Sequence, residues 1–334
     1  MTKQYGFIPP VIKIEDYVFG SLDESKTLKG EVIRADGQWD SDLPENEMQN
    51  RYGFETYNCT NYGTLNCKNT LEQAKYGSFR DDSERFLGVV SETRPGGNNP
   101  HSVAEAVRKF GLIPEPELTW TPDINTWAEY YSPNPMTQKY LDMGKKWLKE
   151  FEFKHEYAFY GSHTLKEKQT RIMEALKYSP IGISVYAWVT RNGLYYKPSG
   201  VADNHWVCLY GYSKDKYWKI FDSYDSTHKK VEWNTNFSFG KKYQLTRIGE
   251  DNSEKKNMLQ RKEGTQEVFL TLGGKRYWIK DQADFEALKE SQPIEKIEWE
   301  NVEKVEDFTY PYDGAIIGTP NFADYLKQLF GKIK

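Results

Sequence analysis

Hydrophobic and polar positions alternate through residues 203–226, DNHWVCLYGYSKDKYWKIFDSYDS, in the pattern expected of two β-strands joined by a short polar turn. Successive side chains of a strand point to opposite faces, so His205 lies on one face and Trp206 and Cys208 lie on the other. The partner strand covers residues 217–221, and SKDK is the expected hairpin loop. This hairpin would place His205 and Asp222 near the same end of a sheet.

Helical periodicity dominates the part of the chain before this hairpin. The first predicted helix begins at Asn58, which can cap it, and it places Cys59 in the first turn. The predicted helices cover residues 58–73, 85–92, 102–110, 136–151 and 164–178, and the predicted strands cover 181–189, 193–198, the hairpin, 229–233 and 243–248. Helices that come first and strands that come second predict an α+β fold with two lobes.

The changes in pattern also predict a division into domains. Residues 1–35 form an extended lead-in, and residues 36–248 form the main domain, with a helical lobe over 36–163 and a β lobe over 164–248. A polar linker, 249–265, leads to a small α/β module, 266–334. In that module we expect a hairpin turning at Gly273-Gly274, a short helix over 283–289 and an amphipathic helix over 321–334 that packs on its own protein.

Composition removes several classes of function. The net charge of −4 provides no basic field for nucleic acid, and no run of about twenty apolar residues predicts a membrane span. The amino terminus lacks the features of a signal peptide, so we expect synthesis in the cytoplasm, which is compatible with a virion-associated protein or with release by lysis. Three cysteines are too few for a disulfide framework or a Cys-rich metal site, so neither a metal nor another cofactor is expected.

Three residues together carry candidate chemistry. Cys59 lies at a predicted helix start, where unpaired N–H groups and the helix dipole favour a thiolate. His205 could take its proton, and Asp222 could orient the imidazole ring. Taken singly, the cysteine is explained by packing, the histidine by an ordinary hydrogen bond and the aspartate by a turn. Together they predict a Cys-His-Asp triad.

Four landmarks resemble those of papain-like cysteine peptidases and occur in that family's order. Residues 204–212, with NH followed by LYGY, resemble the family's N/D-H-A-V…V-G-Y-G strand. Residues 217–224, YWKIFDSY, resemble its Y-W-x-I-K-N-S-W strand, and residues 179–185, SPIGISV, resemble its G-P-V-S-V segment. Residues 95–98, PGGN, resemble its glycine-rich substrate-binding loop.

The resemblance implies a papain-like two-lobed fold, with a helical left lobe and an antiparallel, β-barrel-like right lobe. It also implies a cysteine endopeptidase that acts on polypeptides. The residues expected to contact substrate by this resemblance are Gly96, Gly97, Ile183 and Asn204.

The sequence around the nucleophile departs from the family's pattern. The family has C-G-S-C-W with a glutamine six residues before the reactive cysteine, whereas this chain has ETYNCTNY with Gly53 at that position. Gln49, ten residues before Cys59, can serve as the oxyanion donor only if a short insertion bulges between them. Glu55 would be a poor donor unless protonated. Gln49 is therefore the preferred candidate.

Other departures concern the triad, the cysteines and the lead-in. Asp222 stands where the family usually has asparagine, and it can orient the histidine at least as well. Cys67 and Cys208 are interpreted as core residues because the family's disulfides have no counterpart here. The lead-in exceeds that of the mature family by only about thirty residues, which leaves little room for an inhibitory propeptide. The enzyme is therefore expected to be synthesised active.

Two alternatives remain open. The chain could be a weak or inactive structural or binding component, for example of a phage particle, whose tyrosine-rich cleft holds a peptide or glycan. It could also cleave or transfer amide bonds in peptidoglycan stems. The C-terminal module resembles small β-rich appendages of envelope-acting hydrolases and phage-type proteins. We therefore expect it to dock on another protein or on a cell-envelope surface.

Overall fold

The computed structural model describes residues 5–13, 15–21, 27–28, 30–132, 138–224 and 228–248, together with four strands further along the chain. The chain divides into two compact units, Met1–Ile248 and Gly249–Lys334. Within the described residues, no helix has the length and apolar character needed to cross a membrane.

The first unit combines helices with a single large sheet. Its helices are α1 (Cys59–Tyr76), α2 (Glu84–Val90), α3 (Pro100–Phe110), α4 (Trp127–Tyr130), α5 (Gln138–Glu150) and α6 (Leu165–Ala175). Its strands are β1 (Phe151–Phe159), β2 (Ile181–Val185), β3 (Thr190–Arg191), β4 (Leu194–Tyr195), β5 (His205–Ser213), β6 (Tyr217–Phe221), β7 (Lys229–Glu232) and β8 (Gly240–Arg247). The strand order is β1-β8-β2-β5-β6-β7-β4-β3, and only the β4–β7 pair is parallel.

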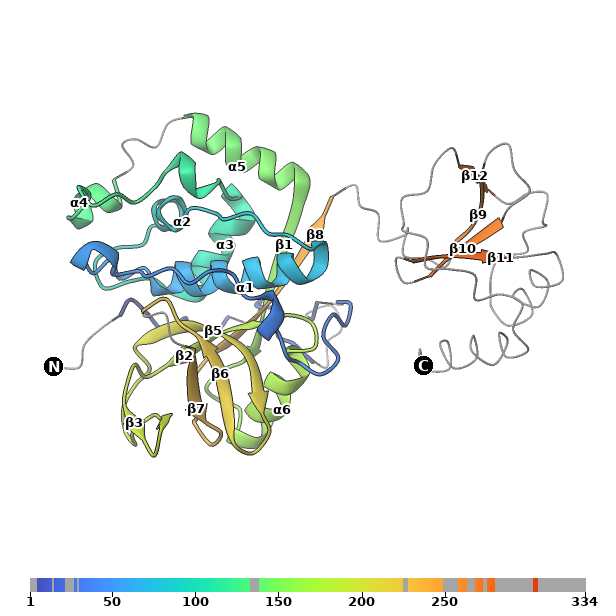
Figure 1. Cartoon of the computed structure of the whole chain (residues 1–334). Helices are drawn as coiled ribbons and strands as arrows, with labels where there is room; N and C mark the ends of the chain where they lie inside the picture. The colour runs from blue at the N-terminus through green and yellow to red at the C-terminus, as the bar shows by residue number, and fades with distance from the viewer. Residues whose placement is uncertain are drawn as a thin grey trace. The chain divides into compact units, whose positions relative to one another are not determined.

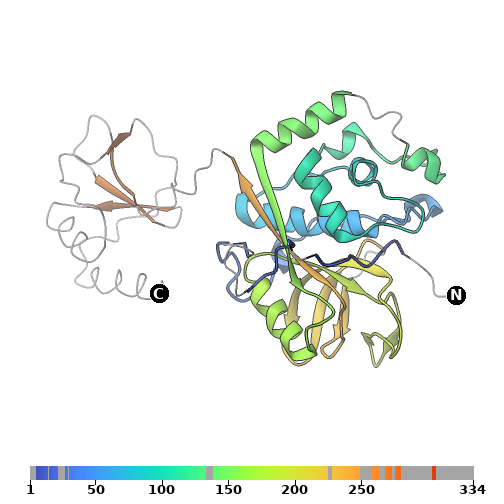
Figure 2. The same cartoon turned by 180° about the vertical axis from the view of Figure 1, so that it is seen from behind.

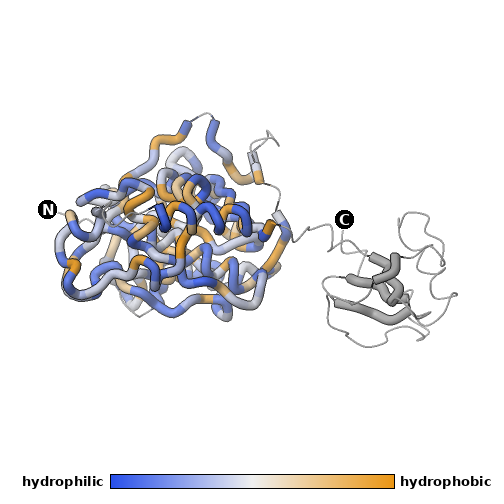
Figure 3. The backbone as a smooth tube through the Cα atoms, turned by 90° about the horizontal axis from the view of Figure 1, so that it is seen from above, coloured by the Kyte–Doolittle hydropathy of each residue, from blue (hydrophilic) through white to orange (hydrophobic). Residues whose placement is uncertain are grey.

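Helices and strands separate into two lobes, which confirms the predicted α+β class. In Figure 1, α1 to α5 gather on one side, while most of the sheet and α6 lie on the other. Figure 3 shows short hydrophobic stretches alternating with hydrophilic ones along the tube, as expected of elements that bury one face. The predicted hairpin is confirmed as β5 and β6.

Helix α1 lies between the lobes and is buried along most of its length. It packs on β5, where Trp206 fits only because glycines face it: a Cβ added at Gly63 or at Gly182 would lie 2.8 or 2.6 Å from the Trp206 ring. The helix ends at Gly77, whose φ of 75° suits glycine and whose N–H bonds to the carbonyl of Gln73. This packing fixes the direction and position of the helix start.

Strand β1 is the largest difference from the sequence-based expectation. Its residues fall in the span assigned to the helical lobe, yet β1 pairs with β8 and forms one edge of the sheet. In FEFKHEYAF, aromatic and charged residues alternate over the first half only, which masks the strand signal. The predicted strands over 181–189 and 193–198 shrink to β2 and to the two-residue β4.

The second unit contains β9 (Met258–Lys262), β10 (Val268–Leu272), β11 (Lys275–Ile279) and β12 (Glu303–Val305), in the order β11-β10-β9-β12. The antiparallel β10–β11 pair confirms the predicted hairpin, whereas β9 lies entirely within residues 249–265, the span predicted as a linker. The predicted helices over 283–289 and 321–334 lie outside the described residues.

Candidate active site

Cys59 is the first residue of α1 and is fully buried. Asn58 occupies the N-cap position, but its side chain does not cap the helix. The Asn58 amide instead donates to the Glu84 carbonyl at 3.1 Å and to the Tyr130 hydroxyl at 3.0 Å. These bonds tie the residue before Cys59 to α2 and to α4, so the helix start is held from the side rather than by its own cap.

His205 and Asp222 form a buried pair in the other lobe. His205 begins β5, Asp222 follows β6, and the distance from His205 Nε2 to Asp222 Oδ1 is 2.6 Å. The other ring nitrogen, Nδ1, is buried and has no hydrogen-bond partner in the described part of the chain. The carboxylate thus fixes the ring through one nitrogen and leaves the other to exchange a proton, although this conformation contains no hydrogen bond from Nδ1 to Cys59.

Asp222 has two further partners that the sequence did not indicate. Its Oδ2 accepts from Lys229 Nζ at 2.7 Å and from Trp188 Nε1 at 3.0 Å. Burial acts to raise the pKa of Asp222, but His205 and Lys229 outweigh it and the pKa lies below its ordinary value. The carboxylate is therefore charged and able to stabilise an imidazolium.

Gln49 lies next to the His205–Asp222 pair, because it is hydrogen-bonded to the residue that follows Asp222. Its side-chain oxygen accepts from Ser223 at 3.0 Å, and its Nε2 donates to the carbonyl of Tyr5 at 3.0 Å and to Glu55 Oε1 at 2.9 Å. The chain between Gln49 and Glu55 makes the turn Arg51–Gly53. The Gln49 amide holds a main-chain carbonyl oxygen in this conformation, and its role as oxyanion donor stays a prediction.

That carbonyl belongs to an N-terminal segment, residues 5–8, which covers the site. Tyr5 N donates to the Asn204 carbonyl at 3.2 Å, and the Tyr5 ring lies 5.3 Å from the His205 ring, centroid to centroid. Phe7 packs with Cys59 and Trp206, and its ring stacks on the Trp206 ring at 5.8 Å and 7°. Figure 2 shows this segment, in dark blue, running along the boundary between the helices and the sheet.

The glycine-rich loop holds the segment from the other lobe. Asn98 N donates to the Gly6 carbonyl at 3.0 Å, and Ile8 N donates to the Asn98 carbonyl at 2.9 Å, which makes a parallel bridge. A Cβ at Gly6 would lie 2.0 Å from the Tyr57 carbonyl oxygen, and a Cβ at Gly97 would lie 1.8 Å from the Gly6 carbonyl oxygen. Only a chain with glycine at both positions can pass this closely.

Burial beneath residues 5–8 affects the protonation of the Cys59 thiol. Burial raises the pKa of the Cys59 thiol well above its ordinary value, and a main-chain hydrogen bond from Trp206 offsets this only in part. The sequence alone predicted a favoured thiolate. In the covered site desolvation outweighs the helix start, and the thiol is neutral. The expectation that the enzyme is synthesised active stays a prediction, and in this conformation residues 5–8 cover Cys59.

The predicted substrate-contacting residues differ in their positions. Gly96 and Gly97 lie in the loop just described, with φ of 100° and 107°. The Asn204 carbonyl contacts Tyr5, while its side chain accepts from Ala187 N at 2.8 Å. Ile183 is fully buried in the main core, opposite Val207 in the sheet, so it supports the site from behind.

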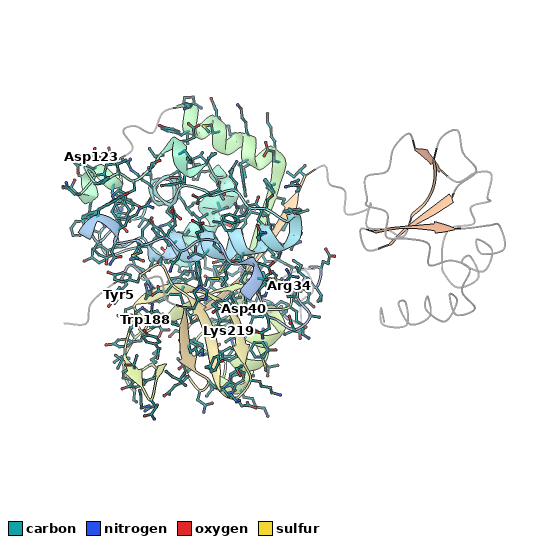
Figure 4. The ribbon with its side chains drawn as sticks, in the orientation of Figure 1. Tyr5, Arg34, Asp40, Asp123, Trp188 and Lys219 are labelled. Atoms are coloured by element: carbon teal, nitrogen blue, oxygen red, sulfur yellow. The ribbon has the colours of Figure 1, made fainter. Side chains whose placement is uncertain are left out.

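Several residues at the site carried no recognisable signal in the sequence. Tyr5 and Trp188, both labelled in Figure 4, contact the His205 ring, as does Tyr224, which the motif at residues 217–224 had included. Tyr224 also donates to Glu55. Cys67 and Cys208 are free and buried, as expected, and they contact each other. Lys229 follows the hairpin by only a few residues, so a search for a cation near Asp222 could have found it.

Comparisons with known proteins find similar solved structures, and those named below share 15% sequence identity or less with this chain. No family model matches the sequence, and no curated protein matches it. Similar solved structures include xylellain, a cysteine protease from Xylella fastidiosa, with 15% identity over 74% of this chain and 96% of that chain, at a TM-score of 0.48. Digestive procathepsin L2 proteinase from the Tenebrio molitor larval midgut has 13% identity over 72% of this chain and 78% of that chain, at 0.49. The proform of the ragweed pollen cysteine protease Amb a 11 has 13% identity at 0.43, and the match spans 62% of this chain and 65% of that one.

Proposed function

We propose that this protein is a papain-like cysteine endopeptidase that cleaves peptide bonds with Cys59, His205 and Asp222. The observation that supports this most is the 2.6 Å pair of His205 and Asp222, whose free ring nitrogen is buried under the same short segment that covers Cys59. A nucleophile, a base and a group that orients the base are the parts that acyl transfer needs.

Each residue has a defined step. His205 Nδ1 takes the proton of the Cys59 thiol, and the sulfur attacks the carbonyl carbon of the scissile bond. The negative oxygen that forms accepts hydrogen bonds from the Gln49 amide and from the Cys59 N–H. His205 then gives its proton to the leaving amine, and water, activated by the same ring, hydrolyses the thioester and restores the thiol.

The described conformation is a latent form of this enzyme. The Tyr5 carbonyl accepts a hydrogen bond from the Gln49 amide, and Phe7 lies against Cys59. The main chain of the same segment bonds to Asn98 and Asn204, whose backbone groups a peptide substrate would use. Turnover therefore requires residues 5–8 to leave. Because the segment belongs to the same chain, its local concentration is high, and added substrate competes with it poorly.

The test compares the full chain with Phe7→Ala and with Phe7→Ala/Cys59→Ala. We expect Phe7→Ala to hydrolyse fluorogenic peptides and to react at Cys59 with a thiol-directed epoxide, and the double variant to do neither. Peptide hydrolysis that persists in the double variant would overturn the proposal. A reactive Cys59 that turns over neither peptides nor peptidoglycan stems would instead favour a binding component.

A further inference from the structure

A cavity of about 400 Å³ lies where α3, β1 and β8 meet Lys13 and residues 15–17. Helix α3 and the two strands lie together in Figure 1. Strand β1 contributes His155 and Tyr157, β8 contributes Lys241, and α3 contributes one face that carries His101 and Glu105. The fourth wall, Lys13 and residues 15–17, follows the segment that covers Cys59 in the chain, so the cavity joins that part of the chain to the body of the domain.

Lys241 is the unusual residue of this cavity. It is fully buried, its Nζ lies 3.0 Å from His155 Nδ1 and 3.8 Å from the centre of the Tyr157 ring, and no carboxylate of a described residue is within ion-pair distance. Equally buried lysines elsewhere differ: Lys229 contacts Asp222 at 2.7 Å, and Lys242 contacts Glu156 at 2.6 Å. Burial lowers the pKa of Lys241 to about 7, against the attraction of surrounding carboxylates. The other two lysines each have a carboxylate in direct contact, whereas the direct contact of Lys241 Nζ is an imidazole nitrogen.

Two more polar groups of the cavity wall lack partners. Tyr157 Oη and His101 Nδ1 are buried without a hydrogen bond in the described part of the chain. The nearest carboxylate to His101 Nδ1 is Asp16 Oδ1, at 3.6 Å, which is beyond hydrogen-bond distance. Buried polar groups in native proteins are nearly always satisfied. The cavity that contains the buried Lys241 ammonium therefore also has two unsatisfied polar atoms in its wall, a phenol oxygen and an imidazole nitrogen.

The two carboxylates nearest to these groups already have donors. Glu105 receives both Arg108 Nε and Nη2, at 2.9 and 2.7 Å, and lies 3.0 Å from His155 Nε2. Asp16 accepts from the Lys13 main-chain N–H at 2.7 Å. Glu105 thus has its counter-charge in Arg108 and Asp16 has a neutral main-chain donor, so neither carboxylate forms an ion pair with Lys241.

We propose that this cavity binds a small molecule through an oxyanion, a phosphate or carboxylate group, and that the bound anion holds Lys13 and residues 15–17, and with them residues 5–8, against the domain. The anion contacts Lys241, Tyr157 and His101. The volume suits a small metabolite rather than a polymer. A ligand that contacts both the segment and the domain body stabilises the covered state by mass action. The site is separate from the proposed peptidase chemistry.

The experiment uses the full chain and titrates inorganic phosphate and citrate separately, against sodium chloride of equal ionic strength. Isothermal titration calorimetry and the melting temperature report binding, and the two ligands separate phosphate from carboxylate recognition. We expect at least one of them to bind with a heat of its own and to raise the melting temperature with its concentration. Neither heat nor a shift beyond that of sodium chloride would overturn the proposal.

Lys241→Met provides the specific test. Without anion it should melt no lower than wild type, because it removes a buried charge whose direct contact is an imidazole nitrogen, and it should bind the anion at least tenfold more weakly. Lys139→Met, on the exposed face of α5, is the control for loss of one positive charge and should behave as wild type. Unchanged anion affinity in Lys241→Met would overturn the assignment of the site.

The link to the covering segment has its own readout. The anion should slow alkylation of Cys59 by iodoacetamide, measured by mass spectrometry of the Cys59 peptide, in wild type and not in Lys241→Met. An anion that binds without slowing alkylation would overturn the coupling. This readout does not depend on peptidase activity, so failure here and failure of the proposed function are distinguishable.

Discussion

Shortening Phe7 should uncover the active site by a calculable amount. The side chain is 97% buried, since its exposed fraction is 3%, and it stacks on Trp206 beside Cys59. Burying a phenylalanine side chain is worth roughly 2–3 kcal/mol, and each 1.4 kcal/mol corresponds to about a factor of ten. If Phe7→Ala loses this energy only in the covered state, the open population should rise about 30- to 150-fold.

Alkylation of Cys59 measures this population. The thiol is unreactive while covered, because it is both shielded and neutral, so the rate with iodoacetamide at pH 7.5 should rise in proportion. Cys67 and Cys208 provide an internal control: they are buried in the core, and they react only if the whole domain unfolds. The expected result is faster labelling of Cys59 alone.

Two further substitutions sharpen the test. Gly6→Ala would force a Cβ to within 2.0 Å of the Tyr57 carbonyl oxygen at a φ of 111°, so it should accelerate labelling at least as strongly as Phe7→Ala. Ile8→Ala is the matched control, because 45% of Ile8 is exposed and its N–H bond to Asn98 survives, and it should change the rate by less than about threefold. Wild-type rates in both Phe7→Ala and Gly6→Ala would refute the covering role of the segment.

Three other predictions concern the site and its surroundings. In an open background, Gln49→Ala should lower kcat by about 10²–10³ with little change in KM, measured on a fluorogenic peptide; a loss below threefold would remove Gln49 from the oxyanion site. Asp222→Asn should lower the free energy of unfolding by about 3 kcal/mol because Lys229 loses its counter-charge, and Asp222→Asn/Lys229→Met should recover at least half of that in urea denaturation. Equal stability of the single and double variants would contradict this. Glu84 and Glu115 should contribute a loss of stability as pH rises from about 4.5 to 7, and Glu84→Gln should remove part of that loss relative to wild type.

The pH prediction follows from a buried group of acids behind α1. Burial, together with neighbouring carboxylates, raises the pKa of Glu115 to about 7 and that of Glu84 well above its ordinary value. A raised folded pKa means that the folded state binds more protons than the unfolded one, so stability is complete below the unfolded pKa and is lost as pH rises through the folded pKa. Asp222, whose pKa is lowered, has the opposite effect at lower pH, as its carboxylate is protonated. Burial lowers the pKa of His155 to about 3, which makes stability rise with pH up to the ordinary pKa of histidine, so the comparison of variants isolates the acids. A pH dependence from pH 4.5 to pH 7 that is the same in Glu84→Gln and in wild type would contradict the role of these acids.

The hairpin and the start of α1 could be predicted because their signals are local. Alternation over β5 and β6 and turn residues between them specify a hairpin, and this alone places His205 and Asp222 at one end of it. Strand β1 could not be predicted in the same way, because it is an edge strand whose pairing partner, β8, lies almost ninety residues away in the sequence. Non-local pairing leaves no pattern in a single segment.

Gln49 shows how far spacing can serve as a guide. Gln49 lies ten residues before Cys59, whereas the family's glutamine lies six before its cysteine. The chain between Gln49 and Cys59 makes the turn Arg51–Gly53. Tyr52 takes a φ of 66° in that turn, a conformation that side chains other than glycine rarely adopt. Nothing in the residue type of Tyr52 predicts it. The hydrogen bonds of Gln49 to Ser223 and to Glu55 hold the chain there, and both come from parts of the fold that spacing cannot reveal.

At Cys59, burial in the tertiary structure outweighs the local effect of the helix start on the thiol. A cysteine at a helix start favours the thiolate by interactions worth about 1 kcal/mol, while complete burial of a charge costs several times more. The sequence contains the first effect in Cys59 and its helix, and the second in Phe7, more than fifty residues earlier. In the proposed mechanism the same helix start is therefore inert under residues 5–8 and reactive once they leave. In this proposal the position of residues 5–8 decides whether the Cys59 thiol reacts, and a cysteine at position 59 is necessary but not sufficient.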